Sequence, residues 1–84
     1  MNSTEKSNLL LALKQGTVTV SFTKIDTQET RVMPCTLNPQ ILKDNGVAMT
    51  LNMSADSDHF VAWALDKNAW RSFRLDTVTS WEKQ

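Results

Sequence analysis

The 84-residue sequence contains only one cysteine, one histidine, two glycines and two prolines. These low counts limit the disulfides, catalytic pairs and glycine-rich loops that the chain can form. Cys35 has no second cysteine for an intrachain disulfide, which suits a reducing compartment. A catalytic pair of Cys35 and His59 is conceivable, but nothing in the sequence requires these side chains to meet. No glycine-rich phosphate loop is present. We therefore expect a protein that is not an enzyme, with Cys35 as a small core side chain.

The chain has no excess charge of either sign, because nine Lys and Arg residues balance nine Asp and Glu residues. Proteins that bind the DNA backbone usually carry a basic excess, so strong nucleic-acid binding is less expected, although a local basic stripe is compatible with neutrality. Asp56 and Asp58 lack the further oxygens of a calcium loop, so we expect neither a metal nor a cofactor.

Long apolar runs are also absent. The longest covers residues 9–13, whereas a membrane span needs about twenty residues. The same run is too short for the core of a signal peptide. We expect a soluble, intracellular protein that does not associate with membranes.

The first sixteen residues have the pattern of a helix. Ser3 or Thr4 is placed to cap its first turn with a hydroxyl, and Gly16 is placed to end it in a left-handed conformation. Three apolar side chains at helical spacing form one stripe: Leu9, Leu10 and Leu13. Because so short a helix is marginal alone in water, this stripe is expected to dock on the end or edge of a sheet.

The rest of the chain alternates between short apolar segments and polar turns. The alternation predicts strands over residues 17–24, 30–37, 47–53, 59–65, 70–75 and 78–81, with a loose tail over 82–84. Pro34 cannot donate to a ladder, so it marks an edge strand or a bulge. The nearly continuous apolar run 59–65 predicts a strand buried on both faces, with Trp63 in the core. A single turn of helix fits Ile41 and Leu42.

One helix followed by five or six short strands predicts a mainly β protein. With so small a chain, closure into an antiparallel barrel is the simplest way to remove exposed sheet edges. We expect a single domain over residues 1–84, in which 1–16 form the N-terminal α-helix and 17–81 form the barrel.

The candidate binding residues lie in and beside the strand 70–75: Trp70, Arg71, Arg74 and Lys67. Two interpretations stay open. Each arginine pairs locally with an acidic neighbour, or one of them clamps a phosphate or carboxylate beside an aromatic ring. Their odd spacing places Arg71 and Arg74 on opposite faces of an ideal strand. Trp70 alternates with Ser72 and Arg74, which indicates a partly exposed tryptophan.

The segment from Phe60 to Asp76 resembles the end of the WYL domain, an Sm-like, SH3-type barrel. An aromatic strand, Phe60-Val61-Ala62-Trp63, is followed after a turn by Arg71-Ser72-Phe73-Arg74-Leu75-Asp76. The family tripeptide Trp-Tyr-Leu is absent from the corresponding positions 58–60, and Thr77 replaces the last arginine of the motif.

The whole chain is similar to the compact relative called WYL_2 or DUF2693. The similar segments are Val18 to Lys24, Arg31 to Leu37, Pro39, and Trp70 to Asp76. This resemblance implies a small phage-encoded SH3-like barrel in a bacterial host cytoplasm. It favours a non-enzymatic interaction module that binds a host or phage protein and modulates host machinery or defence. The alternative is a WYL-like barrel that binds nucleic acid or a nucleotide. A homo-oligomer formed through the strand that holds Pro34 would accompany either function.

Overall fold

The computed structural model describes residues 2–47 and 58–84. The elements in chain order are α1 (Ser3–Gln15), β1 (Thr17–Thr23), β2 (Thr30–Thr36), α2 (Pro39–Asp44), β3 (His59–Ala64), β4 (Ala69–Arg74), the short 3-10 helix η1 (Leu75–Thr77) and β5 (Val78–Lys83). The strand predicted over 47–53 falls almost wholly outside the described residues. The other predicted strands are present with ends that differ by a few residues.

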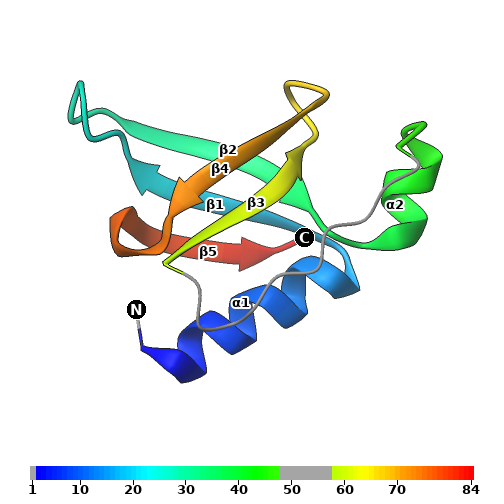
Figure 1. The fold of residues 1–84 in the computed structure, drawn as a ribbon, viewed down its shortest axis with the longest axis horizontal. Helices are drawn as coiled ribbons and strands as arrows, with labels where there is room; N and C mark the ends of the chain where they lie inside the picture. The colour runs from blue at the N-terminus through cyan, green and yellow to red at the C-terminus, as the bar shows by residue number, and fades with distance from the viewer. Residues whose placement is uncertain (1, 48–57) are drawn as a thin grey trace.

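Within the described ranges, five strands form one antiparallel sheet in the order β4-β3-β2-β1-β5. The sheet is strongly curled, so that the β3–β4 hairpin lies across the β1–β2 hairpin (Figure 1). The curl brings the ring of Phe22 on β1 to 5.9 Å from that of Phe73 on β4, although the two strands lie far apart in the strand order. The predicted mainly β fold with an N-terminal helix is confirmed.

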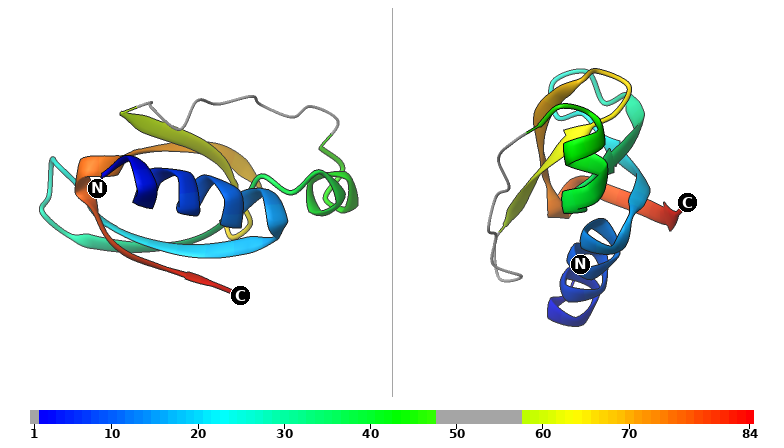
Figure 2. Two further views of the ribbon diagram at one scale, coloured as in Figure 1. Left: turned by 90° about the horizontal axis from the view of Figure 1, so that it is seen from below. Right: turned by 90° about the vertical axis from the view of Figure 1, so that its right-hand side faces the viewer.

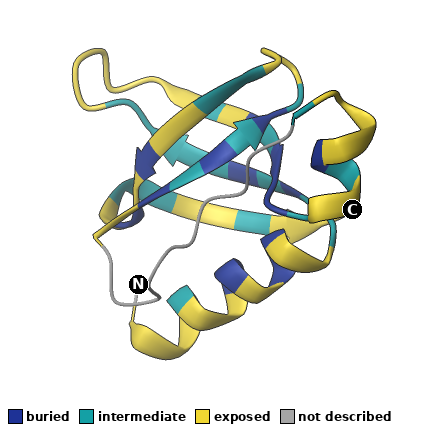
Figure 3. Cartoon of the chain, turned by 45° about the vertical axis from the view of Figure 1, so that its right-hand side comes forward, coloured by how far each residue is buried: buried dark blue, intermediate teal, exposed yellow. Residues whose placement is uncertain are grey.

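The core fills the inside of the curl and is closed by α1, which lies along one end of the sheet (Figure 2). Alternate residues of the strands point inward, among them Val18, Val20, Phe60 and Ala62. The predicted stripe of α1 is buried against them, while Leu11 on the opposite side of the helix is 55% exposed. Figure 3 shows this division between the buried and exposed sides of α1. Docking on the sheet therefore provides the burial that this short helix needs.

Both predicted ends of α1 are corrected by the structure. Asn2, not Ser3 or Thr4, is the N-cap, because its side-chain oxygen accepts the amide of Glu5 at 2.9 Å. Gly16 has a φ of 175°, which is extended backbone and not the left-handed conformation. The chain can leave the helix in this way because the end of β2 satisfies its last carbonyls: the Leu37 amide donates to Leu13 O at 2.9 Å and the Thr36 hydroxyl to Gly16 O at 2.8 Å.

Pro34 marks neither an edge nor a bulge, so both predictions are wrong. It lies in β2, the middle strand of the order, and pairs in register with Thr19 of β1. Its carbonyl accepts the amide of Leu65 on the β3 side, where described pairing involves only Cys35 and Thr36. A backbone N–H at position 34 would point toward β3 as well, where the β2–β3 ladder ends. The proline therefore costs the sheet very little.

Strand β3 is buried on one face and not on both. Its residues alternate between buried and half-buried, with Val61 and Trp63 on the outer face. Trp63 is therefore not a core residue, and its ring meets that of Trp70 edge to face at 5.5 Å.

The tail predicted as loose is part of β5. Glu82 and Lys83 pair with Thr19 and Val18, and the amide of Gln84 donates to Thr17 O at 3.0 Å. The apolar alternation stops at Trp81, but the backbone pairing with β1 continues because it does not depend on side-chain polarity.

A cationic groove between the two hairpins

A groove of ≈ 330 Å³ runs between β4 and the β1–β2 hairpin. We call it the cationic groove, and its described lining residues are Phe22, Lys24, Arg31, Met33, Lys67, Arg71 and Ser72. The two sides of the groove come from parts of the chain that the curl of the sheet brings together (Figure 1). The groove therefore exists only in the folded chain.

Register explains why Arg71 faces this groove. Arg71 lies opposite the buried Ala62 on β3, so its side chain leaves β4 on the inner face of the sheet. Strand β4 is an edge of the described sheet, so no described strand pairs with it on the side away from β3. Arg71 therefore stays exposed although its side chain is on the inner face. Lys67 joins it from the β3–β4 turn, where Asn68 adopts a φ of 50°.

The opposite wall is built by the β1–β2 hairpin. Phe22 pairs directly with Arg31, so a ring and a guanidinium leave the hairpin side by side. Lys24 follows at the start of the turn, which is closed by two backbone bonds: Lys24 N to Glu29 O at 2.8 Å and Gln28 N to Lys24 O at 2.9 Å. A closed turn holds the Lys24 backbone in one place beside the groove.

The charges of the groove are almost all of one sign. Four of the nine cations in this neutral chain line it, and none of its described lining residues is acidic. Arg31 has one acidic neighbour, Asp66, at 3.7 Å between Nη2 and Oδ2. Lys24, Lys67 and Arg71 have no ion pair within the described residues. Four cations with one carboxylate beside them produce a local positive potential that favours an anion.

A second hollow of ≈ 480 Å³ continues from the cationic groove and shares three of its residues: Phe22, Lys24 and Ser72. The rings of Phe22 and Phe73 stack at 5.9 Å with 20° between their planes, and Ile25, 60% exposed, lies at the rim. We call this second hollow the apolar hollow, after its stacked rings and Ile25, although Asp26 and Arg74 also line it. The combined surface has four cations at one end and is mainly apolar at the other. This arrangement suits a ligand that carries a negative charge beside a flat or apolar group.

The four residues proposed from the sequence do not form one cluster. Arg71 and Lys67 share the cationic groove, whereas Arg74 leaves β4 on the opposite face, across from the exposed His59. Trp70 lies on that outer face and packs against Trp63. Arg74 and Trp70 therefore do not converge with Arg71.

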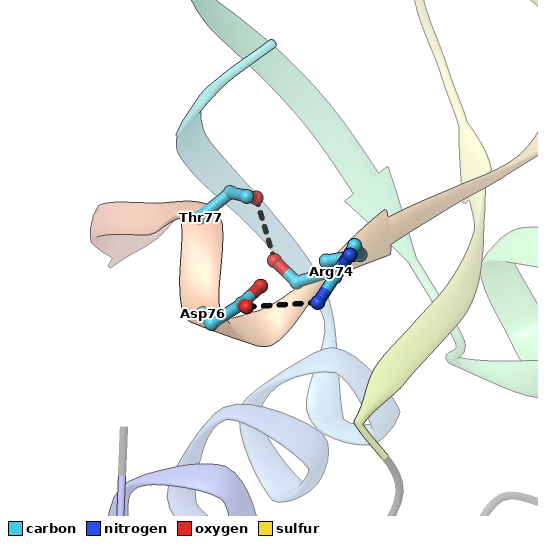
Figure 4. Close-up of polar contacts among 3 residues, drawn as sticks. All are labelled: Arg74, Asp76 and Thr77. Carbon is cyan, nitrogen blue, oxygen red and sulfur yellow. Dashed lines mark hydrogen bonds and ion pairs between the residues drawn. The ribbon is translucent and has the colours of Figure 1, made fainter. Parts of the chain in front are cut away.

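Arg74 forms a local ion pair, in agreement with the interpretation that the arginines pair with acidic neighbours. Its Nη2 pairs with Asp76 Oδ2 at 3.0 Å, and the Thr77 hydroxyl donates to the Arg74 carbonyl at 2.6 Å (Figure 4). Both contacts close the turn of η1 between β4 and β5. Arg74 also lines the apolar hollow, but its guanidinium is already engaged with a carboxylate.

Sequence reasoning missed five of the seven described lining residues: Phe22, Lys24, Arg31, Met33 and Ser72. Phe22 and Met33 were each assigned to one face of a strand, and no binding role was assigned to Lys24 or Arg31. The available signal was the short turn 25–29, which sets Phe22 opposite Arg31 once the hairpin register is assumed. That signal places a cation beside a ring but does not place either beside β4.

Cys35 and His59 do not form a reactive pair. Cys35 pairs with Ala64 at the end of β3, whereas His59 begins that strand and is exposed. Burial, together with the nearby charge of Asp66, raises the pKa of the Cys35 thiol to about 12. Such a thiol is neutral and weakly nucleophilic near neutral pH. In the part of the chain that the structure describes, no cluster of His, Cys, Asp and Glu side chains could hold a metal ion.

The curled antiparallel sheet agrees with the fold described for one known family. A family model described as WYL_2, Sm-like SH3 beta-barrel fold, matches residues 6–79. The chain belongs to the WYL_2 family. No curated protein and no solved structure matches the sequence. Both walls of the cationic groove lie inside the matched range, so the groove is built from the WYL_2 barrel itself. None of the described helices is long and apolar enough to span a membrane.

Proposed function

We propose that this WYL_2 protein is a non-enzymatic binding module whose cationic groove holds a short single-stranded nucleic acid or a nucleotide. The observation that carries the proposal is the convergence of Lys24, Arg31, Lys67 and Arg71 on one groove beside the Phe22 ring. Cations along a groove engage phosphates, and aromatic rings stack on bases regardless of sequence. The adjoining apolar hollow gives a base a place next to its phosphate.

The charge distribution favours a short ligand over a duplex. The whole chain is neutral, so the attraction to phosphates is local to the groove and does not extend over the surface. A groove of ≈ 330 Å³ with an adjoining hollow of ≈ 480 Å³ has room for one or two nucleotides. Duplex DNA would also keep its bases away from Phe22, because they stay stacked in the helix.

A second candidate function is binding of a host or phage protein in a bacterial cytoplasm, where this module would modulate host machinery or defence. Three large apolar side chains outside the core favour it: Leu11, Ile25 and Val32 are 55%, 60% and 57% exposed. Neutral overall charge also suits a protein surface better than a polyphosphate. An acidic segment of such a partner would meet the same four cations.

The decisive experiment measures binding of a fluorescein-labelled oligothymidylate by anisotropy over a range of salt concentrations. With one or two phosphates held among the four cations, the slope of log K against log salt should be between about −0.7 and −1.4. Arg71→Gln and Lys24→Gln should each weaken binding and reduce the magnitude of that slope by up to about 0.7. Lys43→Gln on α2 is the matched control, because Lys43 does not line the groove.

The outcomes separate the two candidates. No binding at low salt, or equal losses for Lys43→Gln and Arg71→Gln, would overturn the nucleic-acid proposal. Binding of a poly-glutamate peptide that depends on Arg71, without binding of the oligothymidylate, would support the protein partner instead. An affinity for duplex DNA equal to that for the single strand would contradict the role given to Phe22.

A further inference from the structure

A second surface lies on the other side of the molecule, between β5 and α1. Two hollows of ≈ 270 Å³ and ≈ 230 Å³ follow one another there and share Trp81. We call them together the β5 groove, and its described lining residues are Glu5, Asn8, Leu11, Ala12, Gln15, Val78, Thr79, Ser80, Trp81 and Lys83. Figures 1 and 2 show β5 and α1 beside each other at this end of the barrel.

Strand β5 is an edge of the described sheet, since its described pairing is with β1 alone. The amide of Gln84 donates to Thr17 O, so the backbone of Gln84 faces β1. In an antiparallel pair every second residue faces the partner strand, so Glu82 and Ser80 also direct their backbone groups toward β1. The backbone N–H and C=O of Trp81 and Lys83 therefore point away from β1, on the outer side of this edge of the described sheet. No described strand pairs with these groups, so they are available to another strand.

The side chains on both walls of the β5 groove determine which side chains an added strand would need. Trp81 and Lys83 lie opposite the inward-facing Val20 and Val18, so their side chains lean toward α1. Leu11 of α1 is 55% exposed and lines the same hollow as Trp81. Glu5 lies at the Val78 end of the groove and Lys83 at the other end. The groove is thus acidic at one end, apolar in the middle and basic at the other end.

We propose that an extended segment of a partner protein adds to the sheet at β5, antiparallel to it, with the pattern acidic-x-apolar-x-basic. Its acidic residue lies opposite Lys83, its apolar residue contacts Trp81 and Leu11, and its basic residue meets Glu5. Alternate residues share a face of a strand, which is why the three side chains are two positions apart. Backbone bonds to Trp81 and Lys83 give the affinity, and the three side chains give the specificity. This inference does not rest on the cationic groove.

The test uses two synthetic peptides with blocked ends, Thr-Asp-Thr-Leu-Thr-Lys-Thr and its charge-reversed form Thr-Lys-Thr-Leu-Thr-Asp-Thr. Amide exchange and chemical shifts of the isotope-labelled protein are followed by NMR during titration. The first peptide should slow exchange of the Trp81 and Lys83 amides at least several-fold and bind more tightly than the reversed form. Methylation of the leucine nitrogen should abolish binding, because that amide faces β5 and all side chains are kept.

Protein variants complete the test. Lys83→Glu should shift the preference toward the charge-reversed peptide, and Leu11→Gln should weaken binding of both without loss of stability, because Leu11 is exposed. Neither change should alter oligothymidylate binding, so failure here is distinguishable from failure of the proposed function. Unchanged Trp81 and Lys83 amides with both peptides would overturn the inference. Protection of the same amides by self-association, seen in sedimentation without peptide, would also overturn it and assign a second copy as the occupant.

Discussion

At the scale of single residues, Cys35 has the most clearly shifted pKa among the described residues. Its side chain is fully buried in β2, and desolvation together with the charge of Asp66 raises its pKa from about 9 to about 12. The fold therefore favours the neutral thiol. This contribution to stability is fully present below about pH 9 and is lost as the pH rises toward about 12.

We predict that the wild-type protein loses stability above about pH 9 faster than Cys35→Ala, by up to about 1.4 kcal/mol per pH unit. The variant also loses packing, so the comparison is between the slopes and not the absolute stabilities. Urea unfolding with reductant, at several pH values between about 8 and 10.5, measures both slopes. Parallel curves would show that Cys35 does not titrate differently in the folded and unfolded chains.

Thr36 connects three segments through one buried hydroxyl. Its Oγ1 donates to Gly16 O at 2.8 Å, accepts the Asn38 amide at 3.0 Å and lies 3.4 Å from Leu13 O. Thr36→Val keeps the shape and removes the hydroxyl, so buried backbone groups lose their partner. We predict a loss of about 1–3 kcal/mol in the free energy of unfolding. Thr30→Val, at the exposed start of β2, should change it by less than about 0.5 kcal/mol. Equal effects of the two changes would contradict the role of the Thr36 hydroxyl.

At the scale of elements, the two glycines have different roles even though both follow a helix. Gly46 follows α2 with a φ of +77°, and its amide donates to Lys43 O at 3.0 Å. Gly16 follows α1 in an extended conformation, and an added Cβ would meet nothing within 4 Å. Position after a helix therefore predicts the left-handed conformation correctly for only one of them.

We predict that Gly46→Ala lowers the free energy of unfolding by about 1–2 kcal/mol, because an L side chain is strained at positive φ. Gly16→Ala should leave it unchanged or raise it by up to about 1 kcal/mol, since alanine restricts the unfolded chain. Thermal and urea unfolding of both variants provide the measurement. A destabilisation by Gly16→Ala as large as that by Gly46→Ala would contradict the assigned cap geometries.

Strand positions were predictable because alternation reports which residues face the core. Val18 and Val20 alternate with Thr17 and Thr19, and the buried set of β1 follows this pattern. Strand ends were less predictable, since β5 extends through Glu82 and Lys83 by backbone pairing alone. The prediction that β3 is buried on both faces was wrong because its outer face also carries large apolar side chains, Val61 and Trp63. The sequence alone does not distinguish them from core residues.

At the scale of the whole molecule, ring packing across the curl connects strands that do not pair. Phe73 on β4 is 4% exposed, stacks on Phe22 of β1 and meets Phe60 edge to face at 6.3 Å. These rings hold the two hairpins against each other, and two of them, Phe22 and Phe73, also line the apolar hollow.

We predict that Phe73→Ala lowers the free energy of unfolding by about 3–5 kcal/mol, whereas Val32→Ala, 57% exposed, changes it by less than about 0.5 kcal/mol. Phe73→Leu should keep the fold but weaken oligothymidylate binding, because Phe22 loses the ring that supports it. Urea unfolding and the anisotropy assay test the two statements separately. Unchanged binding by folded Phe73→Leu would show that Phe22 needs no such support.

The amino-acid sequence by itself determined the helix, most strands and the WYL_2 family, because helical spacing, alternation and turn residues are local properties of the chain. It also supplied Lys67 and Arg71, which lie close together in sequence. Only the tertiary structure decided that Lys24 and Arg31 lie across from them, that Arg74 pairs with Asp76 and that β5 is an edge of the described sheet beside α1. Those outcomes depend on how far the sheet curls and where α1 docks. Both are set by packing between residues distant in sequence, which no local pattern records.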